Sequence, residues 1–332
     1  MHWLILLQIG SWERYSMNIN FVSYLHPHHF YGGGEQYTRG IVEEGERRGH
    51  AFTFSSMAPQ HFGYDAGADL DILFDFWNCP GQPQFDSRFL EVILRRGRYV
   101  NGQCGYSNSC FLAALPCNGK RESGGQCPIT KADYFDVRGL PGPWFDGRCT
   151  AALTYILFQH ARLNCFLSPL HRDTHIKLFG EEIIGDSFLI KPILDITCFK
   201  DLGLTRDIEY ACCGGMGEPK GYFNLKERFP EGNIVLFGSE NAYLAGKEGF
   251  GRFIGKIGFT EMPAFLNRIK NYVHLPRWPE PNGLVVNQAA LCGCNLMVND
   301  NVGATSWDTL NLDDPVSYEN PAREFWERVE TM

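Results

Sequence analysis

Short apolar runs alternate with helical patterns along the first third of the chain. An apolar run at 18–24 predicts a buried strand, a helical pattern follows at 37–48 and ends at Gly49, and an apolar run at 51–54 predicts the next strand. Glycine is common just past the end of a helix, so its position supports this helix. Strands that alternate with helices favour a mostly parallel sheet.

The alternation continues and then restarts. Further strands are predicted at 71–76, 98–100 and 165–167, and helices at 89–96, 151–163 and 171–179. Strands predicted at 208–213, 234–238 and 295–298 then form a second alternating unit, and a glycine-rich loop follows the first of these strands. We therefore expect an α/β protein of two domains in tandem, with the boundary between about 165 and 190.

Length and composition agree with this picture. The 332 residues exceed the size at which a single core usually stops growing, so a cleft between two domains is expected. With 44% hydrophobic and 20% charged residues, the chain has no apolar run of about 18 residues that would span a membrane. The first 16 residues lack the features of a secretion signal, and the 12 cysteines then fit a reducing compartment. We expect a soluble, cytoplasmic protein.

The net charge of −8 counts against a general nucleic-acid surface, which normally needs a basic face. The short basic clusters are Arg47-Arg48 and the run 95–98. Each is interpreted as the solvated end of a helix, where cations suit the helix dipole.

The segment 276–294 carries the clearest chemistry. It places Glu280 in a turn rich in proline and glycine that leads, after Gly283, into an apolar helix. The start of a helix favours negative charge in a ligand, so its free N–H groups could hold a phosphate. Glu280, just upstream, could accept hydrogen bonds from hydroxyl groups. This combination suits a sugar nucleotide.

Together these segments resemble the two-domain glycosyltransferases of the GT-B fold, and among them the retaining family-four enzymes. Six segments carry the likeness. In the first domain they are the first strand at Phe21-Val22-Ser23, the glycine loop at Gly32-Gly33-Gly34-Glu35-Gln36 and the end of the first helix at Arg48-Gly49-His50. The others are the crossing between domains at Ser168-Pro169, the loop after the last core strand at Asn301-Val302-Gly303-Ala304 and the final helix at Phe325-Trp326. The resemblance covers most of the chain from residue 17.

The resemblance implies two Rossmann-like domains that face a cleft. The acceptor side is expected at 17–168 and the domain that binds the nucleotide sugar at 185–315, with a C-terminal helix at about 320–332 packing back on the first domain. Glu280 and Lys220 are the expected catalytic residues. The expected donor-binding residues are Gly214, Gly215, Gly217, Lys220, Glu280, Asn282, Gly283 and Gln288, and the expected phosphate or acceptor loop is Gly32, Gly33, Gly34 and Glu35.

Three positions depart from the family pattern. Gly215 stands where the family has an arginine that reaches the diphosphate, and Arg277 could supply that charge instead. Gln288 replaces the second of two glutamates, although its amide can still pair with ribose hydroxyls. No histidine follows the strand at 98–100, where Asn101 and Gln103 stand.

We expect metal independence and no cofactor besides the nucleotide sugar. Asp69 and Asp71 are interpreted as the solvated start of a strand. A weak zinc candidate remains, Cys104, Cys110, Cys117 and Cys127, whose spacing lacks a Cys-x-x-Cys knuckle and favours buried free thiols. The loop histidines His26, His28 and His29 lie beside the glycine loop and are interpreted as solvated.

The sequence therefore predicts a retaining transferase that moves a hexose or similar sugar from a nucleoside diphosphate to a hydroxyl acceptor. The acceptor is left open: a glycan, a lipid, a small molecule or a modified DNA base, the last as in some viral enzymes. A protein of another class, which binds sugar nucleotides or glycans without catalysis, is the alternative that the three departures suggest. The nucleotide base, the sugar and the oligomeric state are also left open.

Overall fold

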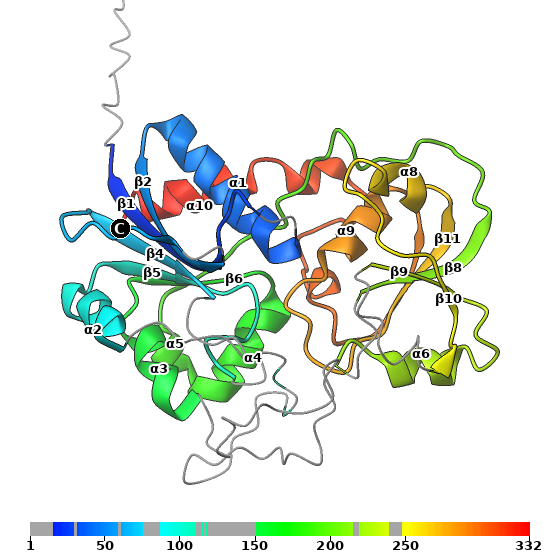
Figure 1. Ribbon diagram of the computed structural model, residues 1–332, viewed down its shortest axis with the longest axis horizontal. Helices are drawn as coiled ribbons and strands as arrows, with labels where there is room; N and C mark the ends of the chain where they lie inside the picture. Colours follow the sequence, from blue (N-terminus) through cyan, green and yellow to red (C-terminus); the bar gives the residue numbers. More distant parts are fainter. Residues whose placement is uncertain are drawn as a thin grey trace, which may run out of the picture.

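The computed structural model describes residues 16–29, 32–58, 61–75, 87–110, 115, 117, 151–214, 219–238 and 248–332. Within these ranges the chain forms two α/β domains that lie side by side, each built around its own sheet (Figure 1). The α/β class predicted from the sequence is thereby confirmed.

The first sheet contains seven strands in the order β3-β2-β1-β4-β5-β6-β7. All neighbours are parallel except β2 and β3. The central strands are buried apolar runs, as expected for a parallel sheet covered on both faces. The strands are β1 (Asn18–Leu25), β2 (Ala51–Ala58), β3 (His61–Phe62), β4 (Leu70–Phe74), β5 (Tyr99–Gly102), β6 (Leu163–Phe166) and β7 (Ser187–Leu189).

Helix α1 (Gly33–Arg48) begins four residues before the start that the sequence predicted. Its N-cap is Gly32, and the carboxylate of Glu35, the third helical residue, accepts a hydrogen bond from the backbone N–H of Gly32. This is the return half of a capping box, and it stabilises a first turn whose glycines have low helix propensity. The other helices of this domain are α2 (Ser87–Arg96), α3 (Ala151–Gln159), α4 (Pro169–Phe179) and α5 (Glu181–Ile184).

The second sheet has five parallel strands in the order β10-β9-β8-β11-β12. They are β8 (Ile208–Cys213), β9 (Val235–Phe237), β10 (Arg252–Phe253), β11 (Ile269–His274) and β12 (Asn295–Val298). Around them lie α6 (Tyr222–Arg228), α8 (Met262–Leu266) and α9 (Leu284–Leu291), and the short helices η2 (Gly303–Thr305) and η3 (Pro315–Tyr318) follow.

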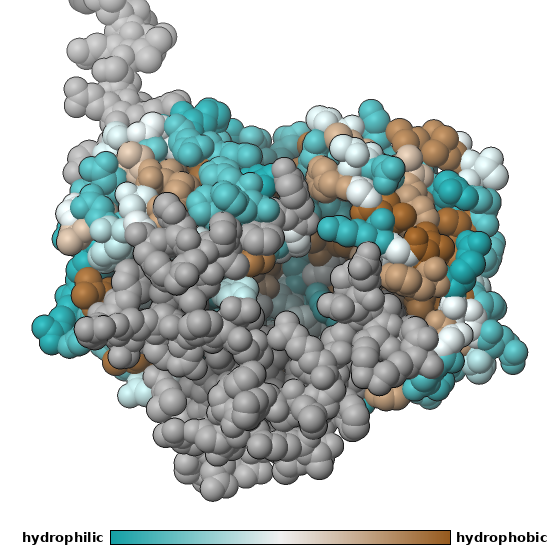
Figure 2. All heavy atoms as spheres, viewed as in Figure 1, coloured by the Kyte–Doolittle hydropathy of each residue, from teal (hydrophilic) through white to brown (hydrophobic). Residues whose placement is uncertain are grey.

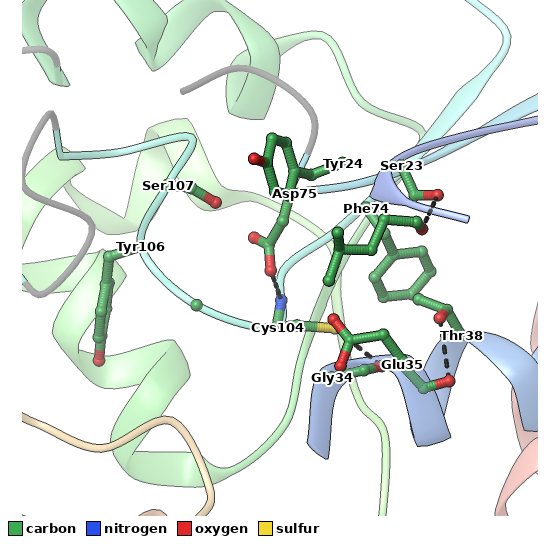
Figure 3. Close-up of a pocket in the computed structure, with 12 residues that line it drawn as sticks. Ser23, Tyr24, Gly34, Glu35, Thr38, Phe74, Asp75, Cys104, Tyr106 and Ser107 are labelled. Carbon is green, nitrogen blue, oxygen red and sulfur yellow. Dashed lines mark hydrogen bonds between the residues drawn. The ribbon is translucent and has the colours of Figure 1, made fainter. Parts of the chain in front are cut away.

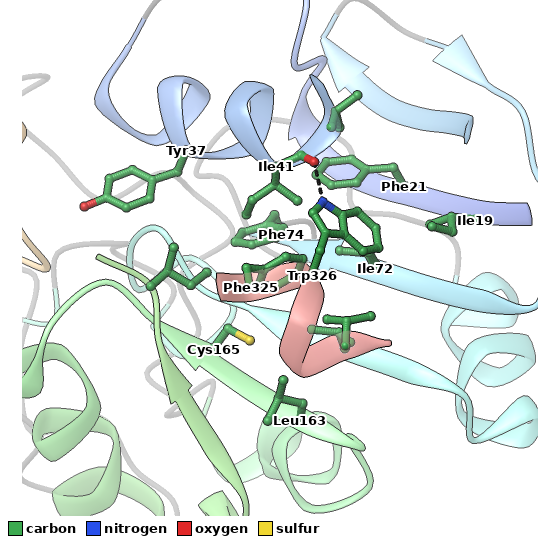
Figure 4. Packing of buried hydrophobic residues seen from close by; sticks show 14 of the residues in the cluster. Ile19, Phe21, Tyr37, Ile41, Ile72, Phe74, Leu163, Cys165, Phe325 and Trp326 are labelled. Atoms are coloured by element: carbon green, nitrogen blue, oxygen red, sulfur yellow. Dashed lines mark hydrogen bonds between the residues drawn. The ribbon is translucent and has the colours of Figure 1, made fainter. Parts of the chain in front are cut away.

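The last helix, α10 (Pro321–Val329), returns to the first domain and packs against α1. Its Trp326 side chain is fully buried and donates a hydrogen bond from Nε1 to the carbonyl oxygen of Ile41, at 2.7 Å (Figure 4). Arg48 of α1 forms an ion pair with Glu330, at 2.7 Å. Helix α10 therefore contributes to the first domain's core.

Two expectations differ from the structure. The donor domain was expected from 185, but β7 pairs with β6 in the first sheet, and the second sheet begins only at Ile208.

Asp71 was interpreted as solvated, which is wrong. It lies within β4, is fully buried, and pairs with Arg96 at 3.0 Å because the guanidinium compensates the buried charge.

The two domains meet at the carboxyl ends of their strands. The segment after β5 touches the segment after β11, where the Tyr106 hydroxyl donates to the carbonyl oxygen of Pro279 at 2.8 Å. A space-filling view shows a hollow between the domains (Figure 2). Ligands of open α/β sheets bind at this edge of the strands. Over the part of the chain that the structure describes, no helix is long and apolar enough to cross a membrane.

Candidate active site between the two domains

Glu280 lies in the loop that joins β11 to α9. Its backbone N–H donates to the carbonyl oxygen of Asn301 at 2.8 Å, and its carbonyl oxygen accepts from the N–H of Gly303 at 3.0 Å. Only 8% of the residue is exposed. These hydrogen bonds hold the backbone of Glu280 against the segment that follows β12.

Lys220 follows the loop after β8 and is tied to the same region. The carbonyl oxygen of Pro219 accepts from the N–H of Arg277 at 3.0 Å. Gly221 has a φ of 86°, and a Cβ atom there would lie 1.9 Å from the carbonyl oxygen of Leu275. Only glycine allows this close approach. The backbone of Lys220 is thus held against the loop that carries Glu280.

The two side chains form an ion pair. Nζ of Lys220 lies 2.7 Å from each carboxylate oxygen of Glu280, and Nε1 of Trp278 donates to Oε2 at 2.6 Å. The same ammonium lies 4.6 Å from the centre of the Trp278 ring, in cation–π contact. Burial would raise the pKa of Glu280, but Lys220 and His274 outweigh it and hold that pKa well below its usual range. Glu280 is therefore ionised at neutral pH.

His274, the last residue of β11, stands beside this pair. Its Nε2 lies 3.7 Å from Oε2 of Glu280, beyond hydrogen-bond distance. The residue is 5% exposed, and neither ring nitrogen has a hydrogen-bond partner among the described residues. A buried imidazole without partners is uncommon, so a ligand hydroxyl or phosphate would find an available group there.

Helix α9 begins directly after this loop. Gly283 is its N-cap, in a left-handed conformation with a φ of 80°, and no side chain caps the helix. Asn282 donates from Nδ2 to Asn287 at 2.8 Å, while its buried Oδ1 has no partner in the described part of the chain. Gln288 is buried further along the helix. The uncapped start of α9 is thus three residues from Glu280.

A pocket of about 230 Å³ lies on the first-domain side of this junction (Figure 3). The ends of β1, β4 and β5 and the start of α1 form it. The described residues that line it are Ser23, Tyr24, Leu25, Gly34, Glu35, Thr38, Phe74, Asp75, Cys104, Gly105, Tyr106 and Ser107.

Asp75 follows β4 and has a φ of 46°, which is rare outside glycine. Its Oδ2 accepts from the N–H of Cys104 at 2.9 Å, and its Oδ1, shielded from solvent, has no partner in the described ranges. Burial raises the pKa of Asp75 to about 7, and the nearby Glu35 carboxylate adds to the shift. Burial also raises the pKa of Glu35 itself.

The first domain holds the Glu280 loop on both sides of the carboxylate. Tyr106, which lines the pocket, bonds to Pro279, and the Ser168 hydroxyl donates to the carbonyl oxygen of Pro281 at 2.5 Å. A Cβ atom at Gly303 would lie 2.2 Å from that same carbonyl oxygen, so glycine is needed there as well. These contacts place the pocket next to the ion pair.

No protein-family profile matches the chain, and no curated protein matches it. Solved structures do. Anabaena Alr3699/HepE in complex with UDP and glucose is similar with a TM-score of 0.54 at 14% identity over 95% of each chain. The same protein in complex with UDP-glucose gives a TM-score of 0.54 at 13% identity, over 95% of this chain and 89% of that one. The chain has the GT-B fold.

A third structure with this fold is an α-glucosyltransferase in complex with UDP and a 13-mer DNA that contains an HMU base. Its TM-score is 0.50 at 11% identity, over 95% of this chain and 93% of that one. At such identities the likeness shows the fold, and the site must be argued from this chain's own residues.

The structure of this GT-B chain brings together the residues predicted around Glu280. Lys220, Glu280, Asn282 and Gly283 lie in one site. Gly214 directly follows β8, and its N–H donates to the carbonyl oxygen of Phe237. Gly215 and Gly217 lie outside the described residues. Of the predicted glycine loop, Gly34 and Glu35 line the pocket of the first domain, while Gly33 faces Leu284 of α9.

Other predictions meet a mixed outcome. Cys127 lies outside the described residues, and those described contain no group of three or more metal-binding side chains. His26 was interpreted as solvated, which is wrong: it is buried, with its ring centre 4.8 Å from that of Phe54. Asn101 and Gln103, at the place of the family's histidine, are buried and bonded to each other at 2.8 Å.

Asp75, His274 and Trp278 were missed from the sequence. Asp75 directly follows β4 and His274 ends β11, and a polar residue at the carboxyl end of a parallel strand was the available signal. His274 was missed because its strand was not predicted at all.

Proposed function

We propose that this protein is a glycosyltransferase that moves a sugar from a nucleoside diphosphate to a hydroxyl group of an acceptor. The Lys220–Glu280 pair at the junction of the two domains carries the proposal. It combines a cation and an ionised carboxylate beside the start of a helix, and the GT-B fold supports this use of the site.

Lys220 would bind the diphosphate of the donor. Its side chain is one-third exposed, so a diphosphate can reach it without unfolding the loop. In a partly desolvated site, a fixed cation stabilises the negative charge that grows on the leaving diphosphate. The first N–H groups of α9, which begins four residues after Glu280, would add to this effect.

Glu280 would bind hydroxyl groups of the donor sugar. Once Lys220 turns to the diphosphate, the carboxylate keeps the hydrogen bond from Trp278 and the proximity of His274. The carboxylate can then accept hydrogen bonds from sugar hydroxyl groups, since it offers about four lone-pair positions. Exchange of partners at Glu280 would thus couple the binding of the diphosphate to that of the sugar.

We extend the proposal to a hexose donor, retention of the anomeric configuration and metal independence. The family resemblance supports retention. Lys220 and the start of α9 support metal independence, because they can supply the positive charge at the diphosphate. UDP-glucose is the first donor to test, since the Anabaena protein was solved with it.

Calorimetric titration with UDP and UDP-glucose tests the proposal. The variants are Lys220→Met and Glu280→Gln, and their matched controls are Lys270→Met and Glu209→Gln, an exposed ion pair of the same domain. We expect Lys220→Met to weaken both ligands by about tenfold or more, and Glu280→Gln to weaken UDP-glucose more than UDP.

Two results would contradict the proposal. One is the absence of binding for UDP, GDP, ADP and TDP and their glucose conjugates. The other is equal affinity in Lys220→Met and Lys270→Met. The non-catalytic alternative, which Gln288 favours in place of the family's glutamate, predicts donor binding without turnover of any sugar.

A further inference from the structure

The pocket at the ends of β1, β4 and β5 is small and acidic. Its volume of about 230 Å³ lies below the range of about 300–1,000 Å³ typical of drug-sized ligands. Two carboxylates, Glu35 and Asp75, belong to its lining, and none of its described lining residues is a lysine, arginine or histidine. It therefore suits a small ligand and disfavours a negatively charged one.

Three hydroxyl groups of the lining already donate their hydrogen bonds within the protein. Ser23 donates to the carbonyl oxygen of Leu25 at 2.7 Å, and Tyr106 donates to Pro279. Thr38 donates to the carbonyl oxygen of Glu35, at 3.2 Å. These three groups offer oxygen lone pairs to the pocket, to which the hydroxyl groups of a ligand can donate.

The glycine-rich start of α1 does not offer a phosphate site. The carboxylate of Glu35 already accepts the N–H groups of Gly32 and of its own backbone. It covers Gly32 so closely that a Cβ atom there would lie 2.0 Å from Oε2. A phosphate would have to displace this carboxylate and would meet Asp75 as well.

Asp75 has one carboxylate oxygen that the protein leaves unsatisfied. Oδ2 takes the N–H of Cys104, whereas Oδ1 has no partner among the described residues. A shielded oxygen without a donor costs free energy, which a ligand hydroxyl would recover. Burial raises the pKa of Asp75 to about 7, and a donor to Oδ1 would favour the ionised form of this carboxyl group.

The pocket lies beside the proposed donor site. Tyr106 belongs to its lining, and its hydroxyl contacts Pro279, the neighbour of Glu280 in the chain. A Cβ atom at Gly33, next to the pocket's Gly34, would lie 3.7 Å from Cβ of Leu284, the first residue of α9. A ligand in the pocket is thereby next to the donor.

From these observations we infer that the pocket takes the acceptor, that the acceptor is a small non-anionic polyol, and that Asp75 accepts a hydrogen bond from one of its hydroxyl groups. This inference rests on the proposed transferase function and adds the chemical class of the acceptor. A phosphate-bearing acceptor, DNA included, is the class that this lining disfavours.

Four ligands that share one ring test the inference: methyl glucoside, glucosamine, glucose 6-phosphate and glucuronate. Their binding to the full chain is measured by saturation-transfer NMR titration, with and without saturating UDP. We expect methyl glucoside and glucosamine to bind about tenfold or more tightly than the two anions. The variant Asp75→Asn should weaken methyl glucoside and bring all four affinities to within about threefold.

The matched control is Asp173→Asn, an exposed carboxylate of the same domain, which should behave as wild type. The variant Glu35→Gln provides a second change in the lining, and it should improve the binding of glucose 6-phosphate. Thermal unfolding of each variant shows that it is folded.

Three results would overturn the inference. The first is that glucose 6-phosphate or glucuronate binds as tightly as methyl glucoside. The second is that Asp75→Asn leaves the four affinities unchanged. The third is that protein which binds UDP binds none of the four ligands. Failure of the proposed function has a different signature. UDP would then not bind, while the ligand series without UDP would still report on the pocket.

Discussion

Nζ of Lys220 lies 2.7 Å from both carboxylate oxygens of Glu280, although the two residues are 60 positions apart in the chain. The loops after two neighbouring strands, β8 and β11, carry them. Without a ligand, each charge compensates the other in a site where Glu280 is almost fully buried. The pair therefore serves the stability of the fold and is also the centre of the proposed donor site.

Removing the cation alone should destabilise the protein. In Lys220→Met the buried Glu280 carboxylate loses its charge partner. We expect this loss to lower the free energy of unfolding by about 1–3 kcal/mol. The effect should be smaller than for a fully buried pair because the Lys220 side chain is one-third exposed. The double variant Lys220→Met/Glu280→Gln should recover part of this loss. Urea unfolding of the two single variants and the double variant measures the coupling.

The exposed pair of Lys270 and Glu209 is the control for that cycle. Its charges are about half exposed, so its coupling should be about 0–1 kcal/mol. If the effects at Lys220 and Glu280 were additive, the two side chains would not depend on each other and this account of the site would be wrong.

Asp75 should make stability depend on pH in the opposite direction to a paired carboxylate. Its pKa is about 7 in the folded protein, against about 3.9 in an unfolded chain. Between these values the folded state holds a proton that the unfolded state has lost, so stability falls as pH rises and levels off above about pH 7. At about 1.4 kcal/mol per pKa unit, the effect is at most about 4 kcal/mol.

Asp75→Asn should remove that slope. Asparagine tolerates the positive φ at this position, so the substitution adds no backbone strain. We expect the variant to exceed wild type in unfolding temperature at about pH 8 and to match it near pH 4. Asp173→Asn should show no such divergence, and parallel curves for Asp75→Asn and wild type would contradict the assignment.

The substitution Gly221→Ala should cost more stability than Gly255→Ala, at a glycine of similar conformation with open space around it. Gly221 and Gly255 have φ values of 86° and 87°. The new Cβ would meet the carbonyl oxygen of Leu275 at Gly221 but no atom within 4 Å at Gly255. Gly255→Ala should therefore cost about 1–2 kcal/mol, the strain of the left-handed conformation alone.

Gly221→Ala adds a clash with backbone, which must shift the loop that carries Lys220. We expect it to cost more stability than Gly255→Ala and to weaken UDP binding, as measured by urea unfolding and calorimetry. Equal losses in the two variants would show that the contact with Leu275 is unimportant.

Trp326 should determine how firmly α10 holds the first domain. Its ring fills space against Gly45, where a Cβ atom would lie 2.6 Å from the ring. Trp326→Ala should cost about 3–5 kcal/mol, while Trp326→Phe keeps most of the volume and mainly loses the bond to Ile41, about 1–2 kcal/mol. Exposed Phe253→Ala is the control, and an effect of similar size there would contradict this role.

The α/β fold was predictable because buried parallel strands appear in the sequence as continuous apolar runs. Strand β11 was not predicted because Lys270, which is exposed, and Asn271, which is half-buried, interrupt its apolar residues. The start of α1 was not predicted because glycines have low helix propensity. The hydrogen bond from the N–H of Gly32 to the Glu35 carboxylate stabilises this turn, and it forms only in the folded chain.

The site was predictable in part. Glu280 and Lys220 stand in recognisable local patterns, a turn before a helix and a lysine–glycine pair. Their ion pair depends on the order of strands in the second sheet, which no local pattern contains. Asp75 was predicted inside a strand, and its turn into the pocket depends on a positive φ that aspartate rarely adopts.

Release of UDP from UDP-glucose, with methyl glucoside or glucosamine as acceptor, tests the central claim most directly. We expect turnover by wild type and by Glu209→Gln, and a loss of about 100-fold or more in Glu280→Gln. Absence of turnover with the UDP, GDP, ADP and TDP conjugates of glucose, in protein that binds a nucleotide, would contradict the transferase. Equal turnover by wild type and Glu280→Gln would contradict the site.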